Sequence, residues 1–200
     1  MSLPRVCWNF RSGGKASVAL VLNEEQRRLQ DTARNFLASH SPVSALRKLR
    51  DKRDTVGYNP ELWQQIAELG WASITLPERY GGLDFGFLGL GVVMEECGRT
   101  LTASPLFASA VLGASTILLG GNEAQKIAIL PQIAAGELTL ALALEESPHH
   151  RPSHITTRAE RDGDGFMLSG SKTFVLDGHS ADLLIVVARR SGEDHSQEGL

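Results

Sequence analysis

Two adjacent carboxylates, Glu95 and Glu96, are the first candidates for chemistry in this chain. General acid–base catalysis can use two carboxyl groups that converge on one proton. The surrounding pattern of apolar residues predicts a helix, however, and neighbouring residues of a helix point about 100° apart. The two carboxyl groups should therefore diverge, and we interpret them as structural residues.

Three histidines in a predicted loop, His149, His150 and His154, are candidates for a metal site because imidazole is a common ligand of zinc. The loop spacing permits such a site. No cysteine and no ordered acidic residue completes a ligand set, so we expect no metal to bind here.

Residues 170–178, Gly-Ser-Lys-Thr-Phe-Val-Leu-Asp-Gly, place a lysine and an aromatic residue just before a turn signal. β-branched and aromatic residues favour extended backbone and Asp177-Gly178 favours a turn, so the segment is predicted to be a strand that ends in a turn. Lys172 is expected at the surface. A plain hairpin accounts for this pattern, and only the surrounding elements can give it a function.

Composition limits the class of protein. The chain has 200 residues, 42% of them hydrophobic, and a formal net charge of -3, which suits a packed core and gives no bulk attraction to nucleic acid or anionic membrane. The two cysteines, Cys7 and Cys97, form no CxxC pair, which argues against a disulfide framework or a zinc module. No apolar run of about 18 residues is present, so no membrane span is expected.

The first 22 residues carry three basic side chains and no acidic one. A mitochondrial transit peptide has this bias, and so does a start introduced by cloning or a misplaced start codon. We interpret residues 1–22 as a disordered extension. The expected location is the cytoplasm, or the mitochondrial matrix if the extension is a transit peptide.

Local signals mark the starts of three helices. Asn followed three residues later by Gln, the capping-box spacing, occurs at Asn23 and again at Asn122. Asn59-Pro60 is an N-cap followed by proline at the first helical position, and Gly70 should end that helix. The predicted buried face of the helix that starts at Asn23 is Leu29, Ala33, Phe36 and Leu37. That of the helix that starts at Asn59 is Leu62, Trp63, Ile66 and Leu69.

The remaining helical segments follow from composition. Residues 45–54 are strongly basic and are interpreted as a solvated face, with a phosphate-contacting patch as the alternative. We expect a glycine-rich loop over 76–91 and a helix over 88–98, so the two predicted ranges share a few residues. Residues 105–119 are apolar or small and predict a helix buried on most sides, and the helix over 122–136 should kink at its internal proline.

Four aromatic residues lie in or near the glycine-rich loop. Trp71 and Tyr80 are expected to brace this loop. Phe85 and Phe87 could line an acyl pocket, but filling the core is the simpler role and the one we predict.

After Gly136 the apolar period changes from that of a helix to that of a strand. Residues 155–161 and 166–171 are predicted to pair through a hairpin turn, and 182–189 to form a buried strand. The fold class is therefore α+β, with an N-terminal all-α bundle at 23–136 followed by the first strands of an antiparallel β-domain at 137–200. Because no strand follows 191–200 to close the sheet, we expect this β-domain to be incomplete.

Five segments, at 70–86, 95–99, 120–137, 142–147 and 170–178, together resemble the acyl-CoA dehydrogenase family and occur in its order. The resemblance covers nearly all of the chain from Leu22 onward. The family's architecture is a helical bundle, a β-domain and a second helical bundle. This chain resembles the first and most of the second, and the C-terminal helical domain is missing.

The resemblance implies a binding site for FAD. Phe174 falls on the family's tryptophan, which packs on the flavin, Leu176 falls on a threonine or serine that hydrogen-bonds to the flavin, and Val175 lies between them. Leu144 and Glu145 belong to a segment whose family threonine meets the flavin's pyrimidine edge.

Other positions in these segments either keep the family residue or depart from it. Glu146 keeps the family's glutamate, whereas Ser147 replaces a proline and Asp177 an asparagine. The family's Gly-Ser-Asp, which contacts phosphate and acyl-CoA, is replaced by a loop in which Arg151 and Ser153 are the candidate substrate contacts.

The departures from the family pattern at Leu176 and Glu145 bear on the chemistry. The side chain of Leu176 cannot donate a hydrogen bond, although its backbone N–H can. Glu145 occupies the position of the family's threonine, and an ionised carboxylate there would oppose hydride acceptance by a ring that becomes anionic on reduction.

The resemblance implies an FAD-dependent dehydrogenase that converts an acyl-CoA thioester to the 2-enoyl-CoA, with electron-transfer flavoprotein as the acceptor. The catalytic base, a glutamate in the family, is expected beyond Leu200. The alternative is a flavin-poor structural subunit that pairs with a dissimilar dehydrogenase chain.

An oligomer is expected from the resemblance and from composition. The helix predicted over 105–119, which includes Leu106, Val111, Ile117 and Leu118, is too apolar to face water on any side. An exposed apolar patch marks an interface or an aggregation hazard, so the 200-residue chain alone is expected to self-associate or be poorly soluble and to bind FAD weakly, whereas an extended chain should form a stable oligomer.

Overall fold

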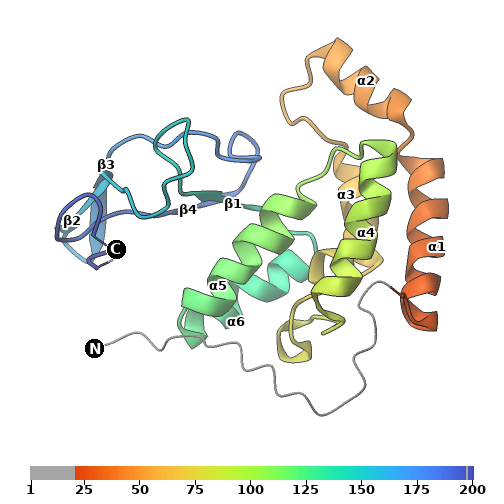
Figure 1. Cartoon of the computed structure of the whole chain (residues 1–200), viewed down its shortest axis with the longest axis horizontal. Helices are drawn as coiled ribbons and strands as arrows, with labels where there is room; N and C mark the ends of the chain where they lie inside the picture. Colours follow the sequence, from red (N-terminus) through yellow and green to blue (C-terminus); the bar gives the residue numbers. More distant parts are fainter. Residues whose placement is uncertain (1–20, 197) are drawn as a thin grey trace.

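A computed structural model describes residues 21–196 and 198–200. The fold is α+β: helices occupy one side of the molecule and short strands the other (Figure 1). The α-helices are α1 (Glu24–His40), α2 (Val43–Lys52), α3 (Pro60–Glu68), α4 (Gly86–Thr100), α5 (Ala114–Gly120) and α6 (Glu123–Ala134). Two 3₁₀ turns, η1 (Trp71–Ser73) and η2 (Glu78–Tyr80), and a π-helix, η3 (Phe107–Gly113), complete the helical part.

The predicted helix starts are confirmed. Both capping boxes form: the Asn23 side chain accepts from the Gln26 N–H at 2.8 Å, and Asn122 accepts from Gln125 at 2.9 Å, with each Gln side chain bonded back to the cap. Asn59 caps α3 ahead of Pro60, and Gly70 follows with φ +76°. These ends are set by neighbours in sequence, which is why the sequence predicts them.

Removing one cap tests this local control. Asn122→Ala is expected to lower the free energy of unfolding by about 1 kcal/mol, because the Gln125 N–H in the first turn of α6 loses its side-chain acceptor. Chemical denaturation followed by circular dichroism measures it. Asn35→Ala is the matched control, since Asn35 is exposed inside α1 and should be neutral or slightly stabilising. Equal losses in the two variants would contradict the assignment.

The core forms in two adjoining clusters. In the first, Trp71 lies among buried residues of α1, α3 and α4, and the ring of Phe36 meets it edge-on at 5.5 Å between centroids. The second joins α6 and the 3₁₀ turns to the sheet through Leu130, Ile133 and Leu140. Trp71 and Tyr80 are thus buried next to the glycine-rich segment, as the sequence predicts.

The acidic pair in α4 has the structural role predicted for it. Glu96 is buried, and its carboxylate accepts a hydrogen bond from the Arg34 guanidinium at 3.0 Å and forms a salt bridge with Arg99 at 3.1 Å. Glu95 is exposed and pairs with the same Arg99 at 2.8 Å. One carboxylate is buried and the other exposed, both pair with Arg99 of the same helix, and the Arg34–Glu96 pair ties α1 to α4.

The glycine-rich segment is more ordered than the predicted loop. Residues 71–80 contain both 3₁₀ turns, and α4 begins at Gly86 rather than Leu88. At Gly82 a Cβ atom would lie 1.8 Å from the carbonyl oxygen of Leu76, so only glycine allows this close backbone approach. Phe85 packs against the first core cluster as predicted, but the prediction for Phe87 is wrong, because its side chain is 65% exposed on α4.

The apolar segment 105–119 is also corrected. It is the π-helix η3 followed by α5, and not one continuous α-helix. Leu106 is fully buried and Val111, Ile117 and Leu118 are partly buried, but Leu119 is 90% exposed. α6 runs through Pro131 to Ala134 as one helix.

The strands form two small sheets. β2 (Arg158–Asp162) and β3 (Gly165–Ser169) make the predicted antiparallel hairpin, with Arg158 opposite Ser169. β1 (Leu140–Ala143) pairs with β4 (Leu183–Val186) in parallel, which differs from the predicted antiparallel arrangement. The Thr139 side chain and N–H bind the Asp182 carboxylate, both at 2.8 Å, and so set this register.

Two predictions for the strands are wrong, one of burial and one of secondary structure. Leu183 and Leu184 of β4 are about half exposed, since among the described residues β4 pairs only with β1. Residues 170–178 form no strand and turn back at 176–180.

In the part of the chain that the structure covers, no helix is long and apolar enough to cross a membrane.

Candidate flavin-binding site

The structure brings together the two segments that the sequence singled out. Residues 144–146 follow directly after β1, and 172–176 follow the hairpin. The Thr173 N–H donates to the Glu145 carbonyl at 2.8 Å, and the Lys172 ammonium donates to the Leu144 carbonyl at 3.1 Å. Backbones 28 residues apart are therefore in direct contact at the end of β1.

A buried ion pair lies where these segments meet. Lys172 Nζ is 2.8 Å from Glu146 Oε1, and the two side chains are only 9% and 7% exposed. The expectation that Lys172 lies at the surface is wrong. A lysine enters a protein interior when a carboxylate neutralises it there, and Glu146 supplies that carboxylate.

The Glu146 carboxylate has four further donors. Thr156 donates through its N–H and its hydroxyl, both at 2.6 Å, and Thr157 does so at 2.9 and 2.5 Å. Burial alone would raise the pKa of Glu146, but the bonds from Lys172, Thr156 and Thr157 outweigh burial and hold this pKa far below its usual range. Glu146 therefore stays ionised well into the acid range.

This depressed pKa predicts acid sensitivity. A carboxylate whose pKa is lower in the folded than in the unfolded state stabilises the fold above its unfolded pKa, near 4.3, and the contribution is lost as the pH falls. Between about pH 5 and pH 3 the wild type should lose about 1–2 kcal/mol more unfolding free energy than Glu146→Gln. Urea titrations at each pH measure this difference, with Glu78→Gln on an exposed site as the control. Parallel pH curves for wild type and Glu146→Gln would contradict it.

The Glu145 side chain points toward the 147–154 loop. Its carboxylate accepts a hydrogen bond from the Arg151 N–H at 3.2 Å and a short one from His150 Nδ1. The Arg151 N–H, followed by His150 and Lys172, lowers the pKa of Glu145, so the group is ionised but compensated by donors. The Arg151 side chain is exposed, and Ser153 is partly buried in the same loop.

The aromatic and apolar residues of 174–176 face solvent. Phe174 is 70% exposed with φ +51°, Leu176 is also exposed, and Val175 is partly buried against Gly178. Asp177 likewise has a positive φ, of +55°. The predicted strand does not form because Lys172 turns inward to Glu146 and the backbone then reverses.

The histidines show no metal-binding geometry. Across residues 21–196 and 198–200 no group of three His, Cys, Asp or Glu side chains is placed to hold a metal ion. His150 is bonded to Glu145, and His154 stacks near His195 with ring centroids 6.0 Å apart. Cys97 is buried, which raises the pKa of its thiol to about 11, so it is not a reactive nucleophile.

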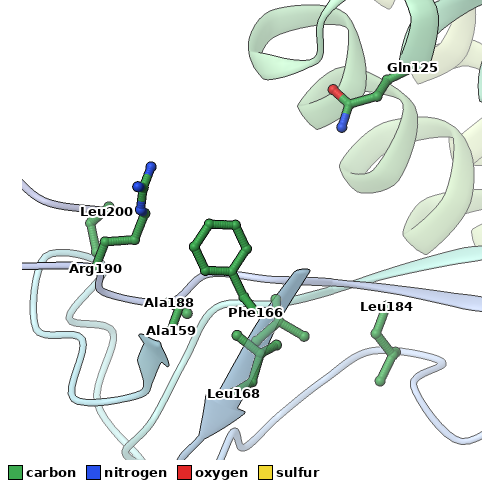
Figure 2. A pocket seen from close by; sticks show the side chains of 9 residues that line it. Gln125, Ala159, Phe166, Leu168, Leu184, Ala188, Arg190 and Leu200 are labelled. Atoms are coloured by element: carbon green, nitrogen blue, oxygen red, sulfur yellow. The ribbon is translucent and has the colours of Figure 1, made fainter. Parts of the chain in front are cut away.

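Sequence reasoning missed Thr156 and Thr157. Their position next to each other is a weak signal, because only the fold shows that both reach Glu146. It also missed an open hollow of about 610 Å³ whose lining includes Phe166 and Leu168 of β3, Leu184 of β4 and Gln125 of α6 (Figure 2). At the edge of this hollow the Arg190 guanidinium lies over the Phe166 ring, 5.1 Å from the ring centroid.

Comparison with known proteins decides the family. The family model described as "Acyl-CoA dehydrogenase, N-terminal domain" matches residues 23–137. The chain belongs to the acyl-CoA dehydrogenase family. Mitochondrial isovaleryl-CoA dehydrogenase of Bos taurus is 37% identical over 172 residues, which is 84% of this chain and 40% of that protein. Acyl-CoA dehydrogenase FadE12 of Mycobacterium tuberculosis is 34% identical over 86% of this chain and 44% of its own length.

Solved structures of acyl-CoA dehydrogenases share the fold. The steroid ACAD Tcur3481-Tcur3483 G363A variant superposes with a TM-score of 0.74 at 32% identity, covering 84% of this chain and 45% of that one. Acyl-CoA dehydrogenase from Geobacillus kaustophilus superposes with a TM-score of 0.72 at 29% sequence identity. The match covers 85% of this chain and 44% of that one. The chain thus spans about two fifths of the length of the curated relatives that it matches.

Proposed function

We propose that this protein takes part in the FAD-dependent α,β-dehydrogenation of an acyl-CoA thioester. The observation that carries the proposal is the contact between residues 144–145 and 172–173 in a chain of the acyl-CoA dehydrogenase family. We assign Leu144, Glu145, Phe174, Val175 and Leu176 to the flavin site. Bound FAD would supply the hydride acceptor for the carbon β to the thioester carbonyl.

The residues present fit a flavin in three respects. Phe174 and Leu176 expose apolar side chains beside backbone that forms no strand, which suits contact with a planar ring. The Glu145 carboxylate is bonded to His150 and to the Arg151 N–H, so its negative charge is partly offset. The backbone N–H of Leu176 can donate where the family uses a hydroxyl.

We assign Arg151 and Ser153 to the substrate side of the site. The Arg151 backbone N–H binds Glu145 and its side chain is exposed, so the guanidinium can reach a phosphate or carbonyl oxygen of acyl-CoA. The base that removes the α-proton is assigned to none of the carboxylates in the part of the chain described. Electron-transfer flavoprotein is the proposed electron acceptor, and the proposed active form is an oligomer in the cytoplasm or mitochondrial matrix.

A second candidate function is a structural subunit with little flavin of its own. Leu176 and Glu145 favour it, because each replaces a hydroxyl that hydrogen-bonds to flavin in the resemblance described above. Among the structural neighbours, the ChsE4-ChsE5 complex from Mycobacterium tuberculosis matches with a TM-score of 0.74 at 26% identity. In this case FAD would be held mainly by a dissimilar partner chain.

Purification alone and with a candidate partner separates the two functions. The proposed dehydrogenase, as the full-length protein, should carry a flavin absorbance band when purified without a partner, and Phe174→Ala should weaken FAD binding at least about fivefold, since base–aromatic contacts are worth about 1–3 kcal/mol. A flavin band that appears only after co-expression with a partner supports the structural subunit. If neither preparation takes up FAD, both proposals are wrong.

A further inference from the structure

Three segments that are distant in sequence meet at the Glu146 carboxylate. Its own segment follows β1, the two threonines at 156–157 precede β2, and Lys172 follows β3. Five hydrogen bonds of 2.5 to 2.9 Å converge on its two oxygens. Glu146 is therefore the common anchor of these segments.

The backbone is shaped to make this convergence possible. Gly170 has φ +156°, and a Cβ atom there would lie 2.5 Å from Thr157 Oγ1 and 2.7 Å from Thr157 Cα. Only glycine lets the chain leaving β3 cross so close to Thr157. The next residues then bring the Lys172 ammonium to both Glu146 and the Leu144 carbonyl.

Little else holds residues 172–176. They belong to no strand, and in this segment the Thr173 N–H bond to Glu145 is the backbone bond that reaches across to 144–146. A buried ion pair contributes little net stability compared with an apolar pair, but it tolerates only one arrangement of its partners. Its effect here is thus on placement more than on global stability.

We propose that Lys172 and Glu146 are positioning residues, whose buried ion pair holds backbone 173–176 beside residues 144–145. This inference rests on the proposed function in that the segment so held is the one assigned to the flavin. Neither side chain need touch flavin, because both are turned into the protein. Loss of the pair should release Phe174 and Leu176 while leaving the helical part intact.

The test compares the wild type with the double variant Glu146→Gln, Lys172→Met. The double variant is chosen because Lys172→Met alone leaves an unpaired buried carboxylate and can fail to fold. Hydrogen exchange of the protein without FAD is measured for peptides covering 171–181 and 24–134, and FAD affinity is measured by flavin fluorescence. Lys126→Met, on α6, is the control for loss of a lysine.

The expected result is at least about tenfold faster exchange over 171–181, unchanged exchange over 24–134, and weaker FAD binding with an altered visible flavin spectrum. Lys172→Arg, which keeps the charge, should restore part of the slow exchange. Unchanged exchange over 171–181, or a uniform increase across both regions, would overturn the positioning role. If the wild type binds no FAD, the proposed function fails, and the exchange data still decide the positioning role independently.

Discussion

Trp71→Ala is expected to lower the free energy of unfolding by about 3–5 kcal/mol. Trp71 is only 1% exposed, and it fills the space between α1, α3 and α4 with its ring edge-on to Phe36. Truncation removes the largest fully buried side chain and leaves a cavity that rigid helices cannot close. Because single domains are stable by only about 5–15 kcal/mol, this variant should be close to unfolding near body temperature.

Guanidinium denaturation followed by far-ultraviolet circular dichroism measures this loss without relying on tryptophan fluorescence. Phe87→Ala is the matched control, since it truncates an aromatic residue that is mostly exposed on α4. The control should change stability by no more than about 0.5 kcal/mol. Similar losses in both variants would show that Trp71 is not the centre of this core.

The second large effect is expected at Arg189, whose guanidinium is completely buried. It donates to backbone carbonyls of the segment that follows it and to one carbonyl just before β2. These acceptors are the carbonyls of Ile155, Ser191, Asp194, Ser196 and Glu198, at 2.7 to 3.4 Å. Arg189→Met keeps the volume of the side-chain stem but removes every donor, so we expect a loss of at least about 3 kcal/mol.

The loss at Arg189 should be accompanied by opening of residues 190–196. Limited proteolysis and denaturant titration of the same preparations measure the two effects. Arg190→Met is the control, because Arg190 is exposed and makes a cation–π contact with Phe166, worth about 0.5–1 kcal/mol. Resistance of Arg189→Met to cleavage in this segment would contradict the role assigned to Arg189.

Features fixed by neighbours in sequence were predictable. The capping boxes at Asn23 and Asn122 and the stop at Gly70 depend on residues within one helical turn, and all three are confirmed. The hairpin β2–β3 was predictable because its turn lies between its two strands. The parallel pairing of β1 with β4 was not, since no local signal links Thr139 to Asp182.

The candidate site was predictable only in part, for the same reason. The resemblance to a family pointed to Phe174 and Glu145, but periodicity made 170–178 a strand and Lys172 a surface residue. Both errors arise from Glu146, whose buried charge draws Lys172 inward and turns the backbone. A single tertiary charge pair therefore overrode the β-propensity of the segment.

The parallel pairing of β1 and β4 also determines when the site can assemble. The Thr139–Asp182 bonds join residues 43 positions apart, so a long loop must close before they form. The backbone hydrogen bonds within each helix at 24–134 join near neighbours, and such contacts form early, also during synthesis from the N-terminus. Leu183–Val186 must leave the ribosome before β1 has its partner. Until then β1 is an unpaired strand beside the helical part. An unpaired strand edge can be bound by a chaperone or can pair with another chain and aggregate.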